Sequence, residues 1–255
     1  MARNKEATGF IIKVAVMLSV VCATLVSIAA VSLKPIQERN AAREKQLNIL
    51  KAAGIYESGM NVEQVFNENF VSKAIDIRTG EVVEDVDVKT YDMLSAAKDP
   101  NQNIVLGDKD IAGIKTISEY AIIYYLMEGE QVEKVILPVN GYGLWGIMYG
   151  FIAIDKDGET IRGLTFYNHK ETPGLGAEIT NANWQASWVG KKAFDNQGQP
   201  AISLVKGGVS NQPERAQYQV DALAGATITS RGVENMVAFW LGENGYQPFL
   251  TQLTQ

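Results

Sequence analysis

The fold is decided by the stretch Tyr120-Ala121-Ile122-Ile123-Tyr124-Tyr125-Leu126, the turn Glu128-Gly129-Glu130 and the stretch Glu133-Lys134-Val135-Ile136-Leu137-Pro138-Val139. Both apolar runs are rich in β-branched and aromatic residues, which favour strands, and the glycine between them permits a hairpin turn. A second pair of such runs, 149–154 and 161–167, flanks Asp155-Lys156-Asp157-Gly158, which we interpret as a plain hairpin turn. This spacing predicts an antiparallel meander.

Helical patterns follow the meander. Apolar residues recur at helical spacing over 178–189 and 229–241, and a strand is expected between them at 202–205. We therefore predict an α+β fold, in which an antiparallel sheet is packed with helices, for a main domain at 113–255.

The segment before the meander predicts smaller elements. A helix is expected over 36–53, and Asn61 can cap a second helix. Thr-Gly at the centre of 75–83 suggests a hairpin, and 95–112 is expected to be an irregular loop. Residues 34–112 are thus predicted to form a connecting helix and an accessory lobe.

One apolar run precedes all of these elements. Residues 14–33 carry no charge, and as a helix they reach about 30 Å, the thickness of a bilayer core. The alternative is a cleaved signal peptide, because basic residues precede the run and small residues lie near its end. Signal cores are usually shorter, about 7–15 apolar residues, so we favour one uncleaved transmembrane helix behind a tail at 1–13. Basic residues on both sides leave the orientation open.

The composition excludes several classes of protein. A net charge of −6, with no long basic cluster, argues against nucleic acid as a partner. The single cysteine, Cys22, excludes an iron–sulfur cluster or c-type haem held by this chain alone, and the single histidine, His169, excludes a multi-histidine metal site within one chain. The G-x-S-x-G elbow of a hydrolase is absent, so we assign no catalytic residue.

A glycine-rich turn is expected between two of the strands. Gly141-Tyr142-Gly143-Leu144-Trp145-Gly146 matches the dinucleotide fingerprint, but that motif needs a following helix and here a strand follows. We interpret the stretch as a turn whose Tyr142 and Trp145 can border a flat ring.

The stretch Asp221-Ala222-Leu223-Ala224-Gly225-Ala226-Thr227-Ile228-Thr229-Ser230 stands before the last predicted helix. Small residues let another molecule approach the backbone closely. The hydroxyls of Thr227, Thr229 and Ser230, together with the free N–H groups of a helix start, make a seat for a phosphate. The alternative is an ordinary helix-entry turn capped by Thr229 or Ser230.

This stretch resembles the flavinylation motif Asp-x-x-(Ser/Thr)-Gly-Ala-Thr of FMN-binding domains in bacterial respiratory complexes, although Ala224 stands where that family prefers a hydroxyl. His169-Lys170-Glu171-Thr172-Pro173-Gly174-Leu175-Gly176 resembles a second stretch of the same domains. With the membrane helix and the chain length, the sequence is similar over nearly its whole length to the family of C subunits of the Na⁺-translocating NADH:quinone reductase.

The resemblance implies a function and its partners. FMN would be joined covalently to Thr227 by a phosphoester bond, attached by a separate flavin transferase, and the chain would relay electrons between neighbouring cofactors of a multi-subunit complex. The anchor would lie in the bacterial inner membrane with the soluble domain in the periplasm. Two alternatives are the G subunit of the related Rnf electron-transport complex, which is favoured less because of the lobe before Gly113, and a cofactor-free membrane-anchored scaffold.

The resemblance also implies a set of cofactor-binding residues. Taken alone, the stretch 171–176 can be merely a loop that caps the helix expected from Glu178, but with the flavin motif downstream we favour a ring-binding loop. Thr172 and nearby N–H groups would bond the polar edge of the flavin, and Leu175 would cover its apolar face. Lys206 can place a positive charge near the flavin or its phosphate, or it can be a solvated surface lysine. The remaining members of the expected site are Glu171, Gly174, Gly176, Gly225 and Ala226.

Overall fold

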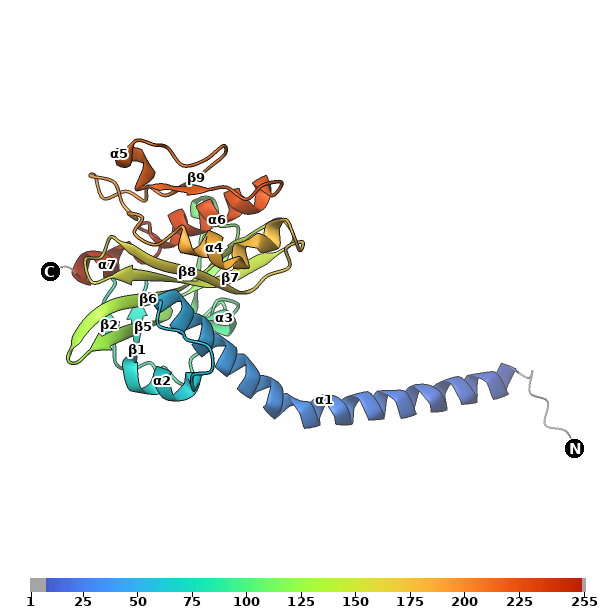
Figure 1. The fold of residues 1–255 in the computed structure, drawn as a ribbon. Helices are drawn as coiled ribbons and strands as arrows, with labels where there is room; N and C mark the ends of the chain where they lie inside the picture. Colours follow the sequence, from blue (N-terminus) through green and yellow to red (C-terminus); the bar gives the residue numbers. More distant parts are fainter. Residues whose placement is uncertain (1–7, 254–255) are drawn as a thin grey trace, which may run out of the picture. The chain divides into compact units, whose positions relative to one another are not determined.

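The computed structural model describes residues 8–253 and divides the chain into two compact units, Met1–Glu44 and Lys45–Gln255. The second unit is an α+β fold built on an antiparallel sheet, as the sequence predicts (Figure 1). The helices are α1 Thr8–Ala53, α2 Val62–Asn69, α3 Met93–Ala96, α4 Ala182–Ala186, α5 Pro213–Ala216, α6 Thr227–Trp240 and α7 Gln247–Leu253, with 3-10 turns η1 Gly107–Lys109 and η2 Gly176–Thr180. The strands are β1 Phe70–Asp76, β2 Val82–Val83, β3 Asn103–Val105, β4 Thr116–Ser118, β5 Tyr120–Glu128, β6 Gln131–Tyr142, β7 Ile147–Asp155, β8 Ile161–Asn168, β9 Ser203–Val205 and β10 Gln219–Asp221.

The main sheet has six strands in the order β2-β1-β5-β6-β7-β8. Strands β5 to β8 form the predicted meander, with Tyr124 opposite Ile136, Ile136 opposite Ala153 and Ile152 opposite Leu164. The short strands β9 and β10 form a separate parallel pair. Strands β3 and β4 form a separate antiparallel pair.

Both faces of the main sheet are covered, which explains why its strands are nearly continuous apolar runs. Along β6, Val135 and Leu137 join one apolar cluster, whereas Ile136 joins the other. The first cluster includes the buried face of α6, and the second includes the last turns of α1 (Figure 1). Alternate side chains of one strand therefore serve two cores, as the period of two requires.

Helix α6 packs very close to β6 because each of the two elements has a glycine at the contact. A Cβ on Gly141 would come within 2.6 Å of Met236 Cβ, and a Cβ on Gly232 would overlap the carbonyl oxygen of Tyr142. At the far end of the helix, Trp240 Nε1 donates to the Asn140 carbonyl at 2.8 Å. These contacts fix the middle and the C-terminal end of α6 against the end of β6.

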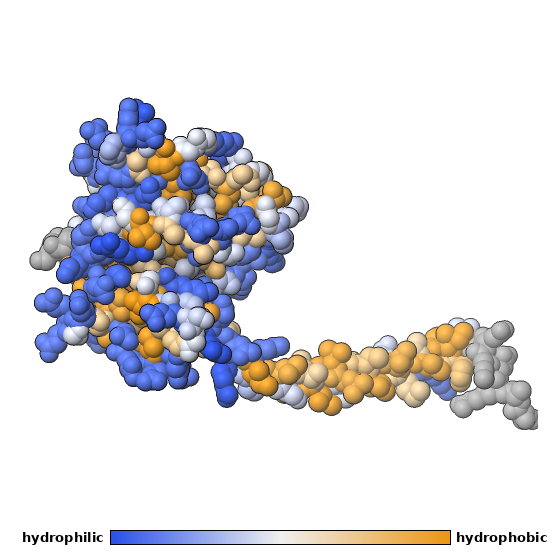
Figure 2. Space-filling view, in the orientation of Figure 1, coloured by the Kyte–Doolittle hydropathy of each residue, from blue (hydrophilic) through white to orange (hydrophobic). Residues whose placement is uncertain are grey.

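In the first unit, α1 is the one described helix that is long and apolar enough to cross a membrane, with a window of mean hydropathy 2.6. Figure 2 shows apolar residues along much of this helix, with hydrophilic residues toward its C-terminal end. The predicted span 14–33 lies inside this helix, and the tail 1–13 lies partly in it and partly outside the described residues. The helix continues past Pro35 into the segment 36–53, so the two predicted helices are one.

Some expectations differ from the structure. The helix expected over 178–189 is only η2 and α4, because Asn181 ends the first and caps the second through its side chain. The loop expected at 95–112 contains β3 and η1. Strand β1 pairs with β5, so a boundary at residue 113 runs through one sheet, and the compact unit begins at Lys45 instead.

We expect Gly232→Ala to lower the free energy of unfolding by about 1–3 kcal/mol, because the added methyl overlaps the Tyr142 carbonyl in a packed interface. Alanine is the better helix former, so an exposed site would give the opposite sign. Urea denaturation of the full chain in detergent measures the change. Arg231→Ala, at the exposed neighbouring position, is the matched control.

Candidate functional site

Three segments that are far apart in sequence meet at the carboxylate of Glu171. Its Oε1 accepts hydrogen bonds from the backbone N–H groups of Leu144 (2.9 Å) and Trp145 (3.0 Å). Its Oε2 accepts from the Thr229 hydroxyl at 2.5 Å. The residue is only 5% exposed. One buried carboxylate thus joins the β6–β7 turn, the loop after β8 and the first turn of α6.

Glycines make room for this carboxylate on two sides. A Cβ on Gly143 would overlap Glu171 Oε1, and a Cβ on Gly176 would overlap Oε2. The turn itself is closed by a hydrogen bond from Gly143 N to Gly146 O at 2.8 Å. The glycine-rich stretch is therefore a turn between strands, as predicted from the absence of a following helix.

Helix α6 begins at Thr227, earlier than the predicted start at 229. Thr227 is exposed, and Gly225, two residues before it, has a left-handed backbone with φ of +73°. A Cβ on Gly225 would come within 3.0 Å of Leu175 Cδ2, so the loop after β8 covers this turn. The first N–H groups of a helix have no intrahelical acceptor, and they are free to bind an anion.

The other two hydroxyls of the predicted phosphate seat point into the protein. Thr229 and Ser230 are buried, and Thr229 donates to Glu171. Ser230 Oγ accepts from Leu223 N and donates to Ala226 O, both at 3.0 Å. Neither residue is the N-cap, because that position is Ala226 and no side chain caps the helix. Thr227 is consequently the one exposed residue of the three.

Large apolar side chains stand exposed on the three joined segments. Trp145 is 61% exposed and Ile228 is 58% exposed. Trp145 is oriented by a 3.1 Å hydrogen bond from its Nε1 to Thr172 Oγ1. The other exposed members are Tyr142, Leu144 and Leu175. Large exposed apolar side chains gathered on segments that one carboxylate joins indicate a binding surface, and these suit a flat aromatic ring.

Sequence reasoning missed Leu144 and Ile228 as members of this surface. Leu144 follows Gly143 in the turn, and Ile228 directly follows Thr227. The available signal was a large apolar residue at the tip of a glycine-rich turn and another in the exposed first turn of a helix. Both side chains are more than 40% exposed.

The remaining expected residues border the site differently. Gly174 has φ of +73°, which allows the sharp turn after Pro173. Lys206 is exposed and directly follows β9, whose Val205 pairs with Asp221 at the start of the motif. His169 has a local structural contact, since its Nδ1 accepts from Glu171 N at 3.2 Å.

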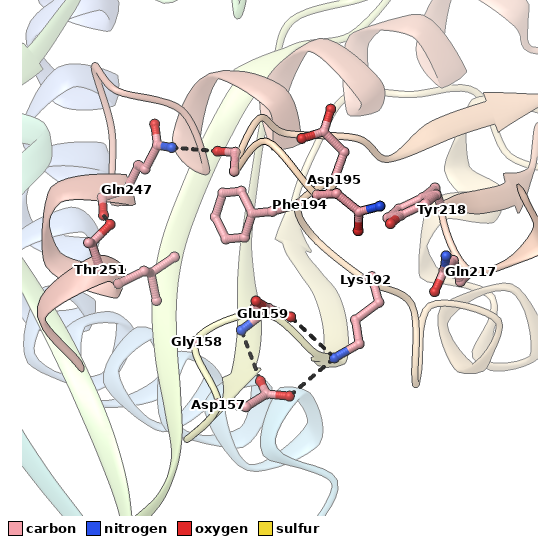
Figure 3. A pocket seen from close by; sticks show the side chains of 13 residues that line it. Asp157, Gly158, Glu159, Lys192, Phe194, Asp195, Gln217, Tyr218, Gln247 and Thr251 are labelled. Atoms are coloured by element: carbon pink, nitrogen blue, oxygen red, sulfur yellow. Dashed lines mark hydrogen bonds and ion pairs between the residues drawn. The ribbon is translucent and has the colours of Figure 1, made fainter. Parts of the chain in front are cut away.

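Figure 3 shows a separate pocket of about 410 Å³ beside the β7–β8 turn. It is lined by the β7–β8 turn and by residues 192–198, 217–218 and 247–251. The nine residues of β7 separate this turn from the one at 143–146, a span of roughly 25 Å. The pocket is therefore distinct from the site around Thr227.

The residues around Thr227 fit FMN. The exposed hydroxyl and the helix start suit a phosphate, and the exposed apolar side chains suit the isoalloxazine ring. Gly225 itself carries no side chain, and the side chain that lies over it is Leu175, one of the exposed apolar residues.

Comparison with known proteins agrees with this geometry. A family model for the FMN-binding domain matches residues 143–242, which contain the β6–β7 turn, the loop after β8 and all of α6. The chain thus carries an FMN-binding domain.

Curated relatives define the family more narrowly. The chain is 44% identical over 258 residues to the C subunit of the Na⁺-translocating NADH-quinone reductase of Yersinia pestis, covering 99% of this chain and 96% of the relative. It is 43% identical over 254 residues to the same subunit from Pseudomonas aeruginosa, covering 98% and 97%. The chain belongs to the family of C subunits of the Na⁺-translocating NADH-quinone reductase, rather than to that of the Rnf G subunits.

Solved structures support the same assignment. The crystal structure of Shewanella oneidensis NqrC matches with a TM-score of 0.77 and 36% identity, covering 84% of this chain and 98% of that chain. The corresponding reductase subunit from Parabacteroides distasonis matches with a TM-score of 0.68 and 30% identity, covering 86% and 97%. As a C subunit, the chain is one subunit of a multi-subunit oxidoreductase, and α1 is its candidate membrane anchor.

We expect Gly143→Ala to displace the Glu171 carboxylate and to lower the free energy of unfolding by about 1–3 kcal/mol. Amide hydrogen exchange at Leu144 and Trp145 should accelerate, because both N–H groups lose their acceptor. Gly146→Ala, in the same turn, is the control, since its Cβ would lie 3.3 Å from the flexible Lys170 side chain. Equal exchange rates in the two variants would contradict the assigned role of Gly143.

The β7–β8 turn gives a prediction about pH. Partial burial raises the pKa of Asp157, but hydrogen bonds from Thr160 and from the backbone N–H of Glu159, with the charge of Lys192, outweigh burial and lower the pKa from 3.8 to about 2. A lowered pKa contributes stability that is present above pH 3.8 and is lost as the pH falls through about 2.

We expect Asp157→Asn to be less stable than the wild type at neutral pH by less than about 1 kcal/mol, because the carboxylate is partly exposed. The difference should shrink between about pH 4 and pH 2. Urea denaturation at a series of pH values measures it, and a difference that grows on acidification would contradict the lowered pKa.

Proposed function

We propose that FMN is joined to Thr227 by a phosphoester bond and that the protein relays electrons between neighbouring redox centres of the complex. The observation that carries the proposal is the position of Thr227, whose side chain is exposed at the first residue of α6 while Thr229 and Ser230 are buried. The motif thus presents one acceptor oxygen beside the free N–H groups of a helix start.

The surrounding residues would hold the two halves of the cofactor. The N-terminus of α6 favours the negative phosphate through its N–H groups and its dipole. Trp145 and Leu175, with the other exposed apolar side chains, would contact the ring, and Thr172 orients Trp145. Lys206 would add a positive charge near the phosphate. Bound FMN supplies the redox chemistry, because it takes up and releases electrons.

Attachment requires an activated flavin nucleotide. Direct esterification of FMN would have to expel water, which is a poor leaving group at a phosphorus atom in aqueous solution. With an FMN phosphate held in a pyrophosphate, the Thr227 oxygen forms the new P–O bond, the pyrophosphate P–O bond breaks and a nucleoside monophosphate leaves. The hydroxyl proton passes to a base of a separate flavin transferase, which would recognise the motif around Thr227.

The membrane helix would keep the flavin with its complex. We place α1 in the bacterial inner membrane and the unit Lys45–Gln255 in the periplasm, as the family resemblance implies. A covalent bond would prevent loss of the cofactor into a dilute compartment.

One observation favours a second candidate, a membrane-anchored scaffold without cofactor. Ala224 is exposed where the flavinylation motif prefers a hydroxyl, so a transferase that reads that hydroxyl would not modify this chain. The scaffold would keep the fold and the exposed apolar surface but would hold no flavin.

We expect Thr227→Val to abolish covalent flavin, because valine keeps the shape of the side chain and removes the acceptor oxygen. The full-length chain is produced in its host, denatured in SDS and examined for flavin fluorescence. Thr227→Ser is the matched control, because it keeps a hydroxyl at the same position. We expect fluorescence in the wild type and in the serine variant.

The circular dichroism spectrum of the valine variant should be unchanged, since Thr227 is exposed and packs little. Fluorescence retained in the valine variant would refute attachment at Thr227. A wild type without flavin would favour the scaffold.

A further inference from the structure

We propose that Glu171 is a positioning residue that also lowers the reduction potential of the bound FMN. The inference rests on the proposed attachment at Thr227. The hydrogen bonds of the Glu171 carboxylate are made to other residues of this chain. Glu171 therefore acts on the cofactor through its charge and through the segments that it holds in place.

The contacts of Glu171 are those of an ionised carboxylate. Its partners are two backbone N–H groups and a hydroxyl, and a backbone N–H can only donate. An ionised carboxylate accepts from all three. Its oxygens are also enclosed by Gly143 and Gly176, where no side chain fits. The surrounding residues therefore form an enclosed site for one negative charge.

The carboxylate contacts the same helix turn that carries the proposed attachment point. Thr229, which donates to Glu171, lies two residues after Thr227 in the first turn of α6. Leu144 and Trp145, whose N–H groups bind the other oxygen, carry two of the exposed apolar side chains. The carboxylate thus fixes the position of the apolar turn relative to the helix start.

The sign of the electrostatic effect follows from the charge. Each electron that enters the flavin without a proton adds negative charge to the ring. A nearby buried anion disfavours that charge, because little solvent screens it, and the reduction potential falls. The same anion is held by donors, so each lost donor increases the field that reaches the site.

Glu171→Gln tests the charge with little change of shape. The glutamine Oε1 can accept from both N–H groups, and its Nε2 can donate to the Thr229 oxygen, which then acts as acceptor. All three contacts remain possible while the charge is removed. Thr229→Val makes the complementary change, since it keeps the charge and removes one donor.

The experiment is a redox titration of the full-length flavinylated protein in detergent, followed by flavin absorbance. We expect a higher potential in Glu171→Gln and a lower potential in Thr229→Val. A purely structural role would not move the two variants in opposite directions. Amide exchange at Leu144 and Trp145 should remain slow in Glu171→Gln, which checks that the turn is intact.

Glu159→Gln is the matched control. It removes the same charge from an exposed side chain at the opposite end of β7, and we expect an unchanged potential. An unchanged or lower potential in Glu171→Gln, with flavin bound, would overturn the inference. If Glu171→Gln does not load flavin, Thr229→Val decides alone, because a rise or no change there would overturn it and a fall would support it.

The outcomes separate the inference from the proposed function. A wild type that carries no covalent flavin at Thr227 contradicts the proposed function. A flavinylated wild type whose potential does not respond to Glu171→Gln contradicts only the role of Glu171.

Discussion

The buried carboxylate of Glu171 is the interaction on which the site depends. Its hydrogen bonds span up to 58 positions in the sequence and connect a strand turn, a loop and a helix start. Burial of a charge is costly unless donors surround it, and here two N–H groups and a hydroxyl do so. The dependence is mutual. The carboxylate fits only because Gly143 and Gly176 have no side chains, and the β6–β7 turn is held because its N–H groups bind the carboxylate.

The rest of the fold supplies the rigid frame for this junction. Close packing of α6 on β6, through Gly141 and Gly232, sets the height of the helix start above the sheet. Trp240 holds the other end of the helix through the Asn140 carbonyl. Because both ends of α6 are fixed, Thr227 and the exposed apolar side chains are presented from a rigid surface, as a cofactor site requires.

The sequence predicts the periodic parts of this structure well. The meander from Tyr120 to Tyr167 follows from apolar runs and turn residues, and the membrane helix follows from an uncharged run of sufficient length. Pairing of β1 with β5 is not predictable from local patterns, because the partner strand is about 50 residues away and only tertiary packing selects it. The same limit explains why local patterns assign 34–112 to a connecting helix and an accessory lobe and do not show its pairing with the main sheet.

The sequence predicts which segments form the site, but it does not predict the directions in which their side chains point. The motif around Thr227 identifies the segment, yet nothing local shows that Thr229 and Ser230 turn inward or that Glu171 is buried. Their directions are set by the register of α6 against β6 and by a hydrogen bond to a residue 58 positions away. Such long-range partners are visible only in the folded chain.

The most direct test of the central claim is the mass of the tryptic peptide 216–231, recovered from native membranes and fragmented to locate any added group. This peptide contains Thr227, Thr229 and Ser230, so fragmentation distinguishes the three hydroxyls. We expect the added mass of FMN less one water, located on Thr227. An unmodified peptide, or the added mass on Thr229 or Ser230, would contradict a covalent FMN at Thr227.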